Sequence, residues 1–201
     1  MEIADTFLVV GLGNPGREYR ETRHNVGFML LDLLAAKLKV RFTRYHSKAL
    51  VAISYYNSPK IDTDVYKIIL AKPQTFMNLS GQSVQGLIHF YKSPLSKLLV
   101  AHDDLDLPIG AIRIRPDGGS AGQKGMSSIL ERLGTDDFAR IRLGIGRPPG
   151  QMQAPDYVLQ GFSGTDMTII QETLSRAVEA VLTFIIEGMD AAMNKYNGIV
   201  S

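Results

Sequence analysis

Residues 7–16 have the sequence FLVVGLGNPG, in which a short apolar, β-favouring run passes directly into a glycine-rich turn. A run of this length, bounded by glycines, predicts a buried strand. Similar runs follow at residues 65–70, 98–101, 112–114 and 141–145. Between and after these runs, apolar residues recur with helical spacing at residues 26–38, 84–91, 126–133 and 167–186.

This alternation predicts an α/β fold of three layers, α/β/α, with a mixed, mostly parallel sheet and ligands bound in loops beyond the carboxyl ends of the strands. A turn-like cluster at residues 55–60 (YYNSPK) predicts a hairpin. Residues 147–153 (RPPGQMQ) predict a flexible loop, followed mostly by one acidic amphipathic helix. We expect one domain over residues 1–201.

The composition excludes several kinds of chemistry. The chain has 201 residues, of which 45% are hydrophobic and 21% charged, as in ordinary soluble proteins. It has no cysteine, which excludes thiol nucleophiles, disulfides and thiolate zinc sites. The first residues lack the basic region of a signal peptide, and no apolar run approaches the roughly 20 residues that span a bilayer. We expect an unprocessed, soluble, cytoplasmic protein that does not bind membranes.

Basic residues outnumber acidic residues over residues 1–150, and acidic residues outnumber basic residues over residues 151–201. The basic residues concentrate in two stretches, one with Arg17, Arg20 and Arg23 and the other with Arg113, Arg115, Lys124, Arg132, Arg140, Arg142 and Arg147. Clusters of this kind either bind phosphate groups or form a solvated face without a partner.

Two familiar motifs do not fit their context. Residues 11–16 match the dinucleotide fingerprint G-x-G-x-x-G, but helical spacing begins only after His24, and Asp32 lies within a predicted helix. Residues 118–122 (GGSAG) match the nucleophile elbow G-x-S-x-G, but no histidine follows Ser120 along the chain, as it does in α/β-hydrolases. We therefore expect neither a nucleotide cofactor nor a serine nucleophile.

Polar residues follow or begin several predicted elements: Asn14, His24, Asn25, Asn78 and Asp103. Imidazole is a general base near neutral pH, a carboxylate can orient it, and amides can position water and a carbonyl oxygen. Together these groups suit ester hydrolysis. The alternative is that they are helix caps and turn residues. Residues 102–106 (HDDLD) could also bind a divalent ion, but no second cluster with ligand spacing accompanies them.

Residues 9–16 (VVGLGNPG) are followed by Tyr19 and by residues 22–27 (TRHNVG), 73–81 (PQTFMNLSG), 100–108 (VAHDDLDLP) and 140–146 (RIRLGIG). These motifs, in this order, resemble those of the bacterial-type peptidyl-tRNA hydrolases, and the resemblance extends from about residue 7 to residue 190. The resemblance implies a phosphorylase/hydrolase-like fold and an esterase that cleaves the bond between a peptide and the 3′-terminal ribose of tRNA.

The resemblance also implies the roles of individual residues. His24 is the base that activates water, Asp103 orients it, and Asn14 distinguishes a blocked peptidyl amine from a free one. Tyr19, Phe76 and Asn78 match family positions that bind the tRNA end, and the basic residues that match the tRNA-facing surface are Arg113, Arg115 and Arg142. The resemblance implies no metal, no other cofactor and no obligate protein partner. It also implies a monomer.

One motif departs from the commonest family pattern, because Gln123-Lys124-Gly125 stands where many members have His-Asn-Gly. Lys124 cannot accept a hydrogen bond as an asparagine would, but it could contact a phosphate. The departure leaves an alternative open, a non-catalytic RNA-binding relative like the chloroplast proteins of this fold that assist intron splicing.

Overall fold

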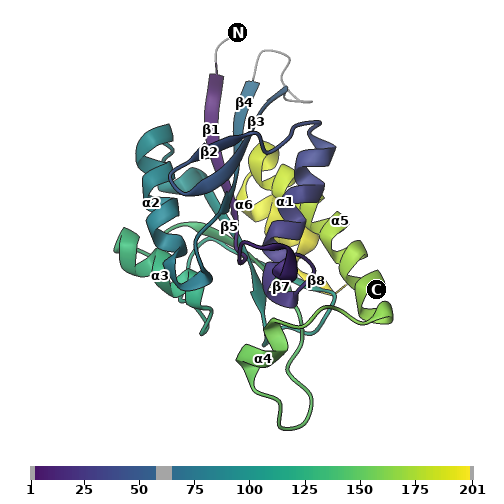
Figure 1. The fold of residues 1–201 in the computed structure, drawn as a ribbon. Helices are drawn as coiled ribbons and strands as arrows, with labels where there is room; N and C mark the ends of the chain where they lie inside the picture. The colour runs from purple at the N-terminus through teal and green to yellow at the C-terminus, as the bar shows by residue number, and fades with distance from the viewer. Residues whose placement is uncertain (1–2, 58–64, 200–201) are drawn as a thin grey trace.

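A mixed sheet forms the centre of the computed structural model, which describes residues 3–57 and 65–199 (Figure 1). Its eight strands, among the described residues, lie in the order β2-β3-β4-β1-β5-β7-β6-β8. Their bounds are β1 (Ile3–Gly11), β2 (Arg44–His46), β3 (Ala49–Asn57), β4 (Val65–Pro73), β5 (Leu98–Asp104), β6 (Ala111–Arg115), β7 (Ala139–Gly144) and β8 (Gly198–Ile199).

The central strands of this sheet are parallel and the outer ones antiparallel. β1 pairs in parallel with β4 and with β5, and β5 pairs in parallel with β7. β3 runs antiparallel to β2 and β4, and β6 runs antiparallel to β7 and β8. The predicted mixed sheet is confirmed, with its parallel pairs at the centre. The carboxyl ends of β1, β4, β5 and β7 therefore meet at one edge, where ligands gather in such folds.

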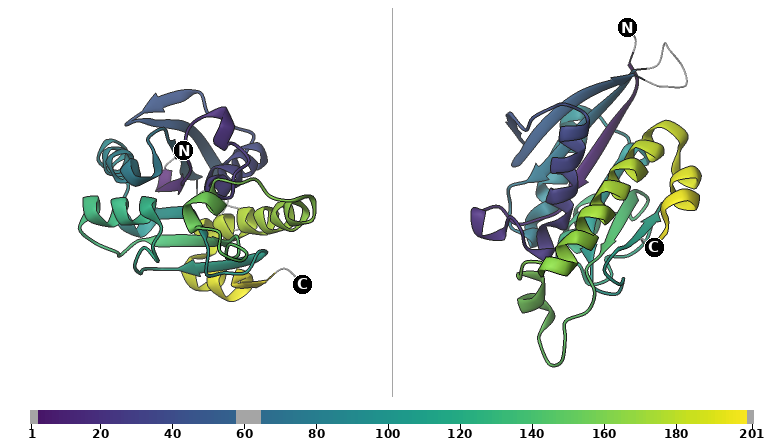
Figure 2. Two further views of the ribbon diagram at one scale, coloured as in Figure 1. Left: turned by 60° about the horizontal axis from the view of Figure 1, so that its bottom comes forward. Right: turned by 90° about the vertical axis from the view of Figure 1, so that its right-hand side faces the viewer.

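Helices cover both faces of the sheet, as predicted (Figure 2). The side chains of β1 divide between two cores: Phe7 and Val9 pack on one face, and Leu8 and Val10 on the other. Alternation of this kind is expected of a strand that is buried on both sides. One face carries α1 (Val26–Lys37), α5 (Gly164–Glu187) and α6 (Met189–Tyr196), and the other carries α2 (Ser80–Tyr91) and α3 (Lys124–Leu133).

The segment after residue 153 is more broken than the expected single helix. It contains the short helix α4 (Ala154–Val158) and α6 in addition to the long helix α5, and it ends in β8. Gly188 separates α5 from α6 with a φ of 91°, a conformation that favours glycine and ends the helix. None of the helices in residues 3–57 and 65–199 has the length and apolar character needed to cross a membrane.

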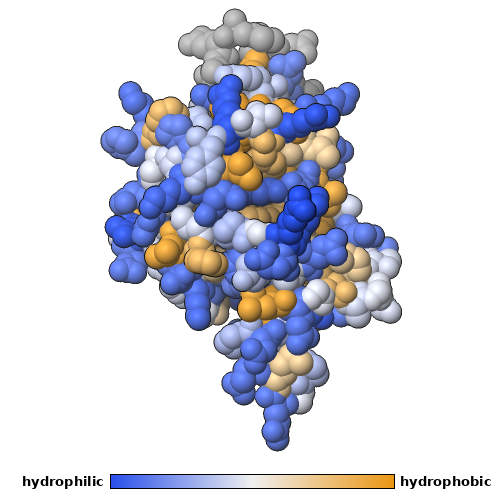
Figure 3. Space-filling model, in the orientation of Figure 1, coloured by the Kyte–Doolittle hydropathy of each residue, from blue (hydrophilic) through white to orange (hydrophobic). Residues whose placement is uncertain are grey.

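The predicted loop and hairpin are both present, with one difference. The stretch 147–153 contains no helix or strand, and together with α4 it projects from the molecule as a mainly hydrophilic extension (Figures 1 and 3). β3 and β4 form the antiparallel pair of the hairpin. Residues 55–57 lie in β3 and not in a turn, because their backbone pairs with residues 65–67 of β4. Residues 58–60 of the expected turn lie outside the described residues.

The first turn of α1 lies in backbone contact with the strands beneath it. A Cβ atom on Gly27 would lie 2.5 Å from the carbonyl oxygen of Ala101 and 2.6 Å from the backbone nitrogen of Leu12. A Cβ atom on Gly11 would lie 2.3 Å from the carbonyl oxygen of Gly27. Only glycine fits at either position, so the G-x-G-x-x-G match reflects in part the packing of a helix on a strand.

We predict that Gly27→Ala destabilises the protein by about 1–3 kcal/mol, as overpacking of a filled site does. The sign of this change in stability is informative, because alanine in an uncrowded helix should stabilise the protein by roughly 1 kcal/mol relative to glycine. Gly164→Ala is the matched control: Gly164 also lies in the first turn of a helix, but a Cβ atom there would meet nothing within 4 Å. Urea denaturation measures both, and a Gly27→Ala protein as stable as the control would refute the close approach.

Candidate active site

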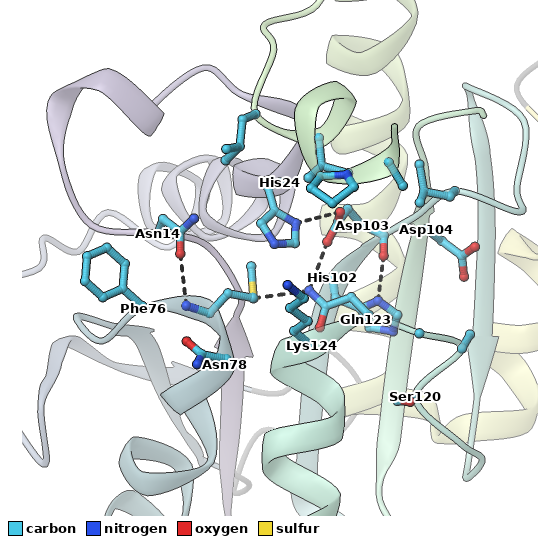
Figure 4. Close-up of a pocket in the computed structure, with 18 residues that line it drawn as sticks. Asn14, His24, Phe76, Asn78, His102, Asp103, Asp104, Ser120, Gln123 and Lys124 are labelled. Atoms are coloured by element: carbon cyan, nitrogen blue, oxygen red, sulfur yellow. Dashed lines mark hydrogen bonds and ion pairs between the residues drawn. The ribbon is translucent and has the colours of Figure 1, made fainter. Parts of the chain in front are cut away.

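A cavity of about 630 Å³ lies beyond the carboxyl ends of β1 and β5. The N-terminus of α3 and the helix α4 complete its walls (Figure 4). The cavity thus occupies the edge of the sheet at which the sequence placed the ligand site. Several residues singled out from the sequence line it together: Asn14, His24, Phe76, Asn78, Asp103 and Lys124.

His24 and Asp103 are in direct contact. His24 lies in a short 3-10 helix, η2 (Arg23–Asn25), that leads straight into α1. Its Nδ1 atom is 2.8 Å from Oδ2 of Asp103, where 13% of the His24 side chain and 4% of the Asp103 side chain are exposed. An ionised carboxylate can only accept, so Nδ1 carries the proton and Nε2 of the neutral ring is an acceptor. That acceptor is available in the cavity to a water molecule.

Asn14 is held rigidly by its neighbours. The backbone nitrogen of Asn14 donates to Oδ1 of Asn25 at 2.8 Å, and Nδ2 of Asn25 donates to the carbonyl oxygen of Asn14 at 2.9 Å. The backbone nitrogen of Met77 donates to Oδ1 of Asn14 at 2.9 Å (Figure 4). This last bond identifies the oxygen end of the amide, since a backbone N–H can only donate. The hydrogen bond to Oδ1 therefore leaves Nδ2 as the donor that Asn14 can offer to the cavity.

The remaining side chains from the sequence set lie at the rim. Phe76 is 60% exposed and stands just before the 3-10 helix η3 (Met77–Leu79), which contains Asn78. Asn78 is exposed as well, and Lys124 is the exposed first residue of α3. The rim therefore offers an aromatic face, an amide and a positive charge to a bound molecule.

Gln123 contacts Asp103 directly, which the sequence interpretation did not anticipate. Its Nε2 atom donates to Oδ1 of Asp103 at 3.0 Å, and its Oε1 atom accepts from the backbone nitrogen of Met126 at 2.8 Å. It is thus the N-cap of α3 and a partner of the carboxylate at once. The signal available in the sequence was its place three residues before the predicted helix at residues 126–133.

Arg23 is a second residue whose importance the sequence did not reveal. It is buried, its guanidinium donates to the carbonyl oxygen of Gly161, and its carbon Cζ lies 4.3 Å from the centre of the Tyr157 ring. The backbone nitrogen of Arg23 also donates to the carbonyl oxygen of Gln160 at 2.9 Å. Arg23 therefore fastens η2, which carries His24, to α4 and the segment after it, which form a wall of the cavity.

His102 and the carboxylates beside it do not form a metal site. Burial lowers the pKa of the His102 imidazole below its usual value, and Nδ1 of this ring donates to the carbonyl oxygen of Asp103 at 2.7 Å. Asp104 and Asp106 each pair with an arginine. In the part of the chain that the structure describes, no three His, Cys, Asp or Glu side chains are grouped so as to hold a metal ion.

Four of the predicted basic residues lie together on β6 and β7, outside the lining of the first cavity, although one of them, Arg140, is buried. Arg113 lies opposite Arg142 in the register of these strands, and Arg115 lies opposite Arg140. Because Ile112 and its alternate neighbours face the core that contains α5, all four arginines point to the other face. A second cavity of about 300 Å³ is lined by Arg115, Arg140 and Arg142 but not by Arg113, which is exposed.

Two of the residues predicted to contact tRNA are less accessible than the others. Arg142 is not free, because its Nε atom donates to Oδ2 of the buried residue Asp104. Tyr19 lies at the end of the 3-10 helix η1 (Arg17–Tyr19), in the loop before His24, and is half-buried outside the lining of the cavity.

The motifs rejected from the sequence have other structural roles. The glycine-rich turn after β1 leads into η1 and not into a helix that could bind pyrophosphate, and Asp32 lies within α1, paired with Lys72. Burial lowers the pKa of Lys72 against the opposing effect of Asp32. Ser120 lies in the loop between β6 and α3, and its carbonyl oxygen accepts from the backbone nitrogen of Gln123 at 2.9 Å. It does not occupy a strand-to-helix elbow.

Comparison with known proteins agrees with this arrangement. The family model described as "Peptidyl-tRNA hydrolase" matches residues 8–201. The chain is 46% identical to a peptidyl-tRNA hydrolase of Carboxydothermus hydrogenoformans, over 95% of this chain and 98% of that protein. It is also 46% identical to one of Syntrophomonas wolfei, over 94% of this chain and 99% of the relative.

The fold agrees as closely with a solved structure. The crystal structure of peptidyl-tRNA hydrolase from Acinetobacter baumannii superposes with a TM-score of 0.88 at 30% sequence identity, covering 99% of this chain and 98% of that one. The similarity extends over the whole sheet and its helices, including the elements that form the cavity. The chain belongs to the peptidyl-tRNA hydrolase family.

Proposed function

We propose that the protein hydrolyses the ester between a peptide and the 3′-terminal ribose of tRNA, with His24 as the general base and Asp103 as the group that orients it. The observation that carries this proposal is the 2.8 Å contact between Nδ1 of His24 and Oδ2 of Asp103 inside an open cavity. It leaves Nε2 of His24 as a proton acceptor that can take a proton from water, the task of a general base in ester hydrolysis.

The reaction follows from this geometry. Nε2 of His24 takes a proton from water while the water oxygen attacks the ester carbonyl carbon. The amide donors of Asn14 and Asn78 stabilise the negative charge that develops on the carbonyl oxygen and position the substrate. The bond to the ribose oxygen then breaks, and the imidazolium of His24 returns its proton to that oxygen. The products are a free peptide carboxylate and tRNA with its terminal hydroxyl restored.

Asn14 also suits discrimination between blocked and free amines. Its Oδ1 atom is occupied by the backbone nitrogen of Met77, so it presents only its Nδ2 donor to a ligand. A peptide carbonyl can accept from that donor, whereas an ammonium group of a free aminoacyl ester can only donate. The proposed preference is therefore for peptidyl over aminoacyl esters.

The rim residues suit the single-stranded end of tRNA. The exposed ring of Phe76 can stack on an unpaired base, and such stacking is the usual way that proteins hold bases of single-stranded RNA. Tyr19 and Asn78 are proposed to bind the same end, and Lys124 to contact a phosphate. Arg113, Arg115 and Arg142 are proposed to bind backbone phosphates, which gives affinity without reading sequence.

We propose that residues 1–201 act as one catalytic domain, as a monomer and without an obligate protein partner or cofactor. The alternative, a non-catalytic RNA-binding relative, is not favoured, because the relatives that match over nearly their whole length are named as hydrolases.

We predict that His24→Ala and Asp103→Asn each lower the rate of peptide release from N-acetyl-aminoacyl-tRNA by roughly a hundredfold or more, the usual worth of a positioned general base. Asp106→Asn is the matched control, because Asp106 belongs to the same acidic run but pairs with Arg147 at the surface. The Asp106→Asn protein should release peptide at the rate of the unaltered protein. Addition of EDTA should leave the rate of the unaltered protein unchanged, because the proposed mechanism uses no metal. Wild-type rates in the His24→Ala protein would rule the mechanism out.

A second prediction concerns the basic surface. Arg113→Gln and Arg115→Gln should each weaken tRNA binding and reduce the slope of log K against log salt concentration by about one, as the loss of one phosphate contact does. Both side chains are exposed, so the two variants should fold like the unaltered protein. Lys37→Gln, which removes an exposed charge from the outer side of α1, should leave the slope unchanged. Equal slopes for all three variants would place the phosphate contacts elsewhere.

A further inference from the structure

We infer that Gln123 is a positioning residue for this reaction, which fixes the carboxylate of Asp103 so that the carboxylate in turn fixes His24. The inference rests on the function proposed above. Gln123 is 8% exposed, and it contacts the carboxylate through the oxygen that His24 does not use. Asp103 thus has one oxygen on the imidazole and the other on the amide (Figure 4).

The orientation of the Gln123 amide is determined by its other end. Oε1 accepts from the backbone nitrogen of Met126, in the first turn of α3, and this N–H can only donate. The NH₂ group must therefore face Asp103. A side chain at position 125 would disturb this arrangement, because a Cβ atom built on Gly125 would lie 3.0 Å from Oε1. The rigid end of α3 thereby holds a donor in front of the carboxylate.

The carboxylate of Asp103 requires a second hydrogen-bond donor besides His24. The terminal torsion of an aspartate is broad, so a single hydrogen bond from His24 does not by itself hold the plane of the carboxylate. The side chain is also nearly inaccessible to water, and a buried carboxylate oxygen without a donor is costly. The donor from Gln123 satisfies the second oxygen and restrains rotation.

The same amide joins the two sides of the site. Besides its bond to Asp103, Nε2 of Gln123 lies 3.2 Å from the sulfur atom of Met77, and the backbone nitrogen of Met77 holds Oδ1 of Asn14. One glutamine therefore connects the carboxylate that orients His24 with the residue that orients Asn14.

The test compares Gln123→Glu with Gln123→Met in the full-length protein. Gln123→Glu keeps an oxygen to cap α3 but places an acceptor against Oδ1 of Asp103, while Gln123→Met removes both bonds at similar volume. Both should lower kcat for N-acetyl-aminoacyl-tRNA by roughly ten- to a hundredfold, the worth of a hydrogen bond to a charged group. KM should stay within about twofold, because substrate contacts are untouched. Because two carboxylates would then face each other in a buried place, the Gln123→Glu protein should melt at a lower temperature, so rates are compared well below the melting temperature of each variant.

Ser127→Ala is the control, because Oγ of Ser127 donates to the carbonyl oxygen of Gln123 at the same helix end without touching Asp103, and it should keep full activity. The NMR signal of the His24 Nδ1 proton should move in the Gln123→Glu protein and not in the Ser127→Ala protein. Unchanged kcat in both Gln123 variants, with the His24→Ala protein inactive, would overturn only the role of Gln123. An inactive wild-type protein would overturn the proposed function and this inference with it.

Discussion

The contact of Gly27 with the sheet, where no side chain separates α1 from the strands, is the constraint on which the site depends. Gly27 rests against the backbone of Leu12 and Ala101, and His24 lies three residues before it in the chain. Asp103 lies two residues beyond Ala101 on β5. The spacing between a helix and a strand therefore sets the distance between the imidazole and the carboxylate. A methyl group at Gly27 would push α1 away from the strands and so separate His24 from Asp103.

Other contacts hold the remaining parts of the site to this frame. Arg23 ties η2 to the segment around α4 through the carbonyl oxygens of Gln160 and Gly161. On the opposite side, Gln123 ties the end of α3 to Asp103. The side chains proposed to act in catalysis thus come from separate elements, and each is held by a group of another element. Asn14 is held by the backbone of Met77, His24 by Asp103, and Asp103 by Gln123. Preorganisation of this kind lets amide and carboxylate groups act without rearranging during the reaction.

Much of the fold was predictable from sequence because the central strands are buried on both faces and so form continuous apolar runs, such as residues 7–11. The end of α5 was also predictable, since the helical spacing runs to residue 186, but the short helix α6 and the strand β8 that follow Gly188 were not predicted. Family motifs gave the residues around the cavity, including His24 and Asp103. They could not give the contacts of Gln123, which exist only because the ends of α3 and β5 meet in space.

The most direct test of the account compares two esters as substrates of the unaltered protein: N-acetyl-aminoacyl-tRNA and the same aminoacyl-tRNA with a free amine. The account predicts that the blocked ester is cleaved to the N-acetyl-amino acid and intact tRNA, and that the ester with a free amine is not cleaved. Binding of tRNA with no cleavage of either ester would contradict the account and leave an RNA-binding protein in place of a hydrolase.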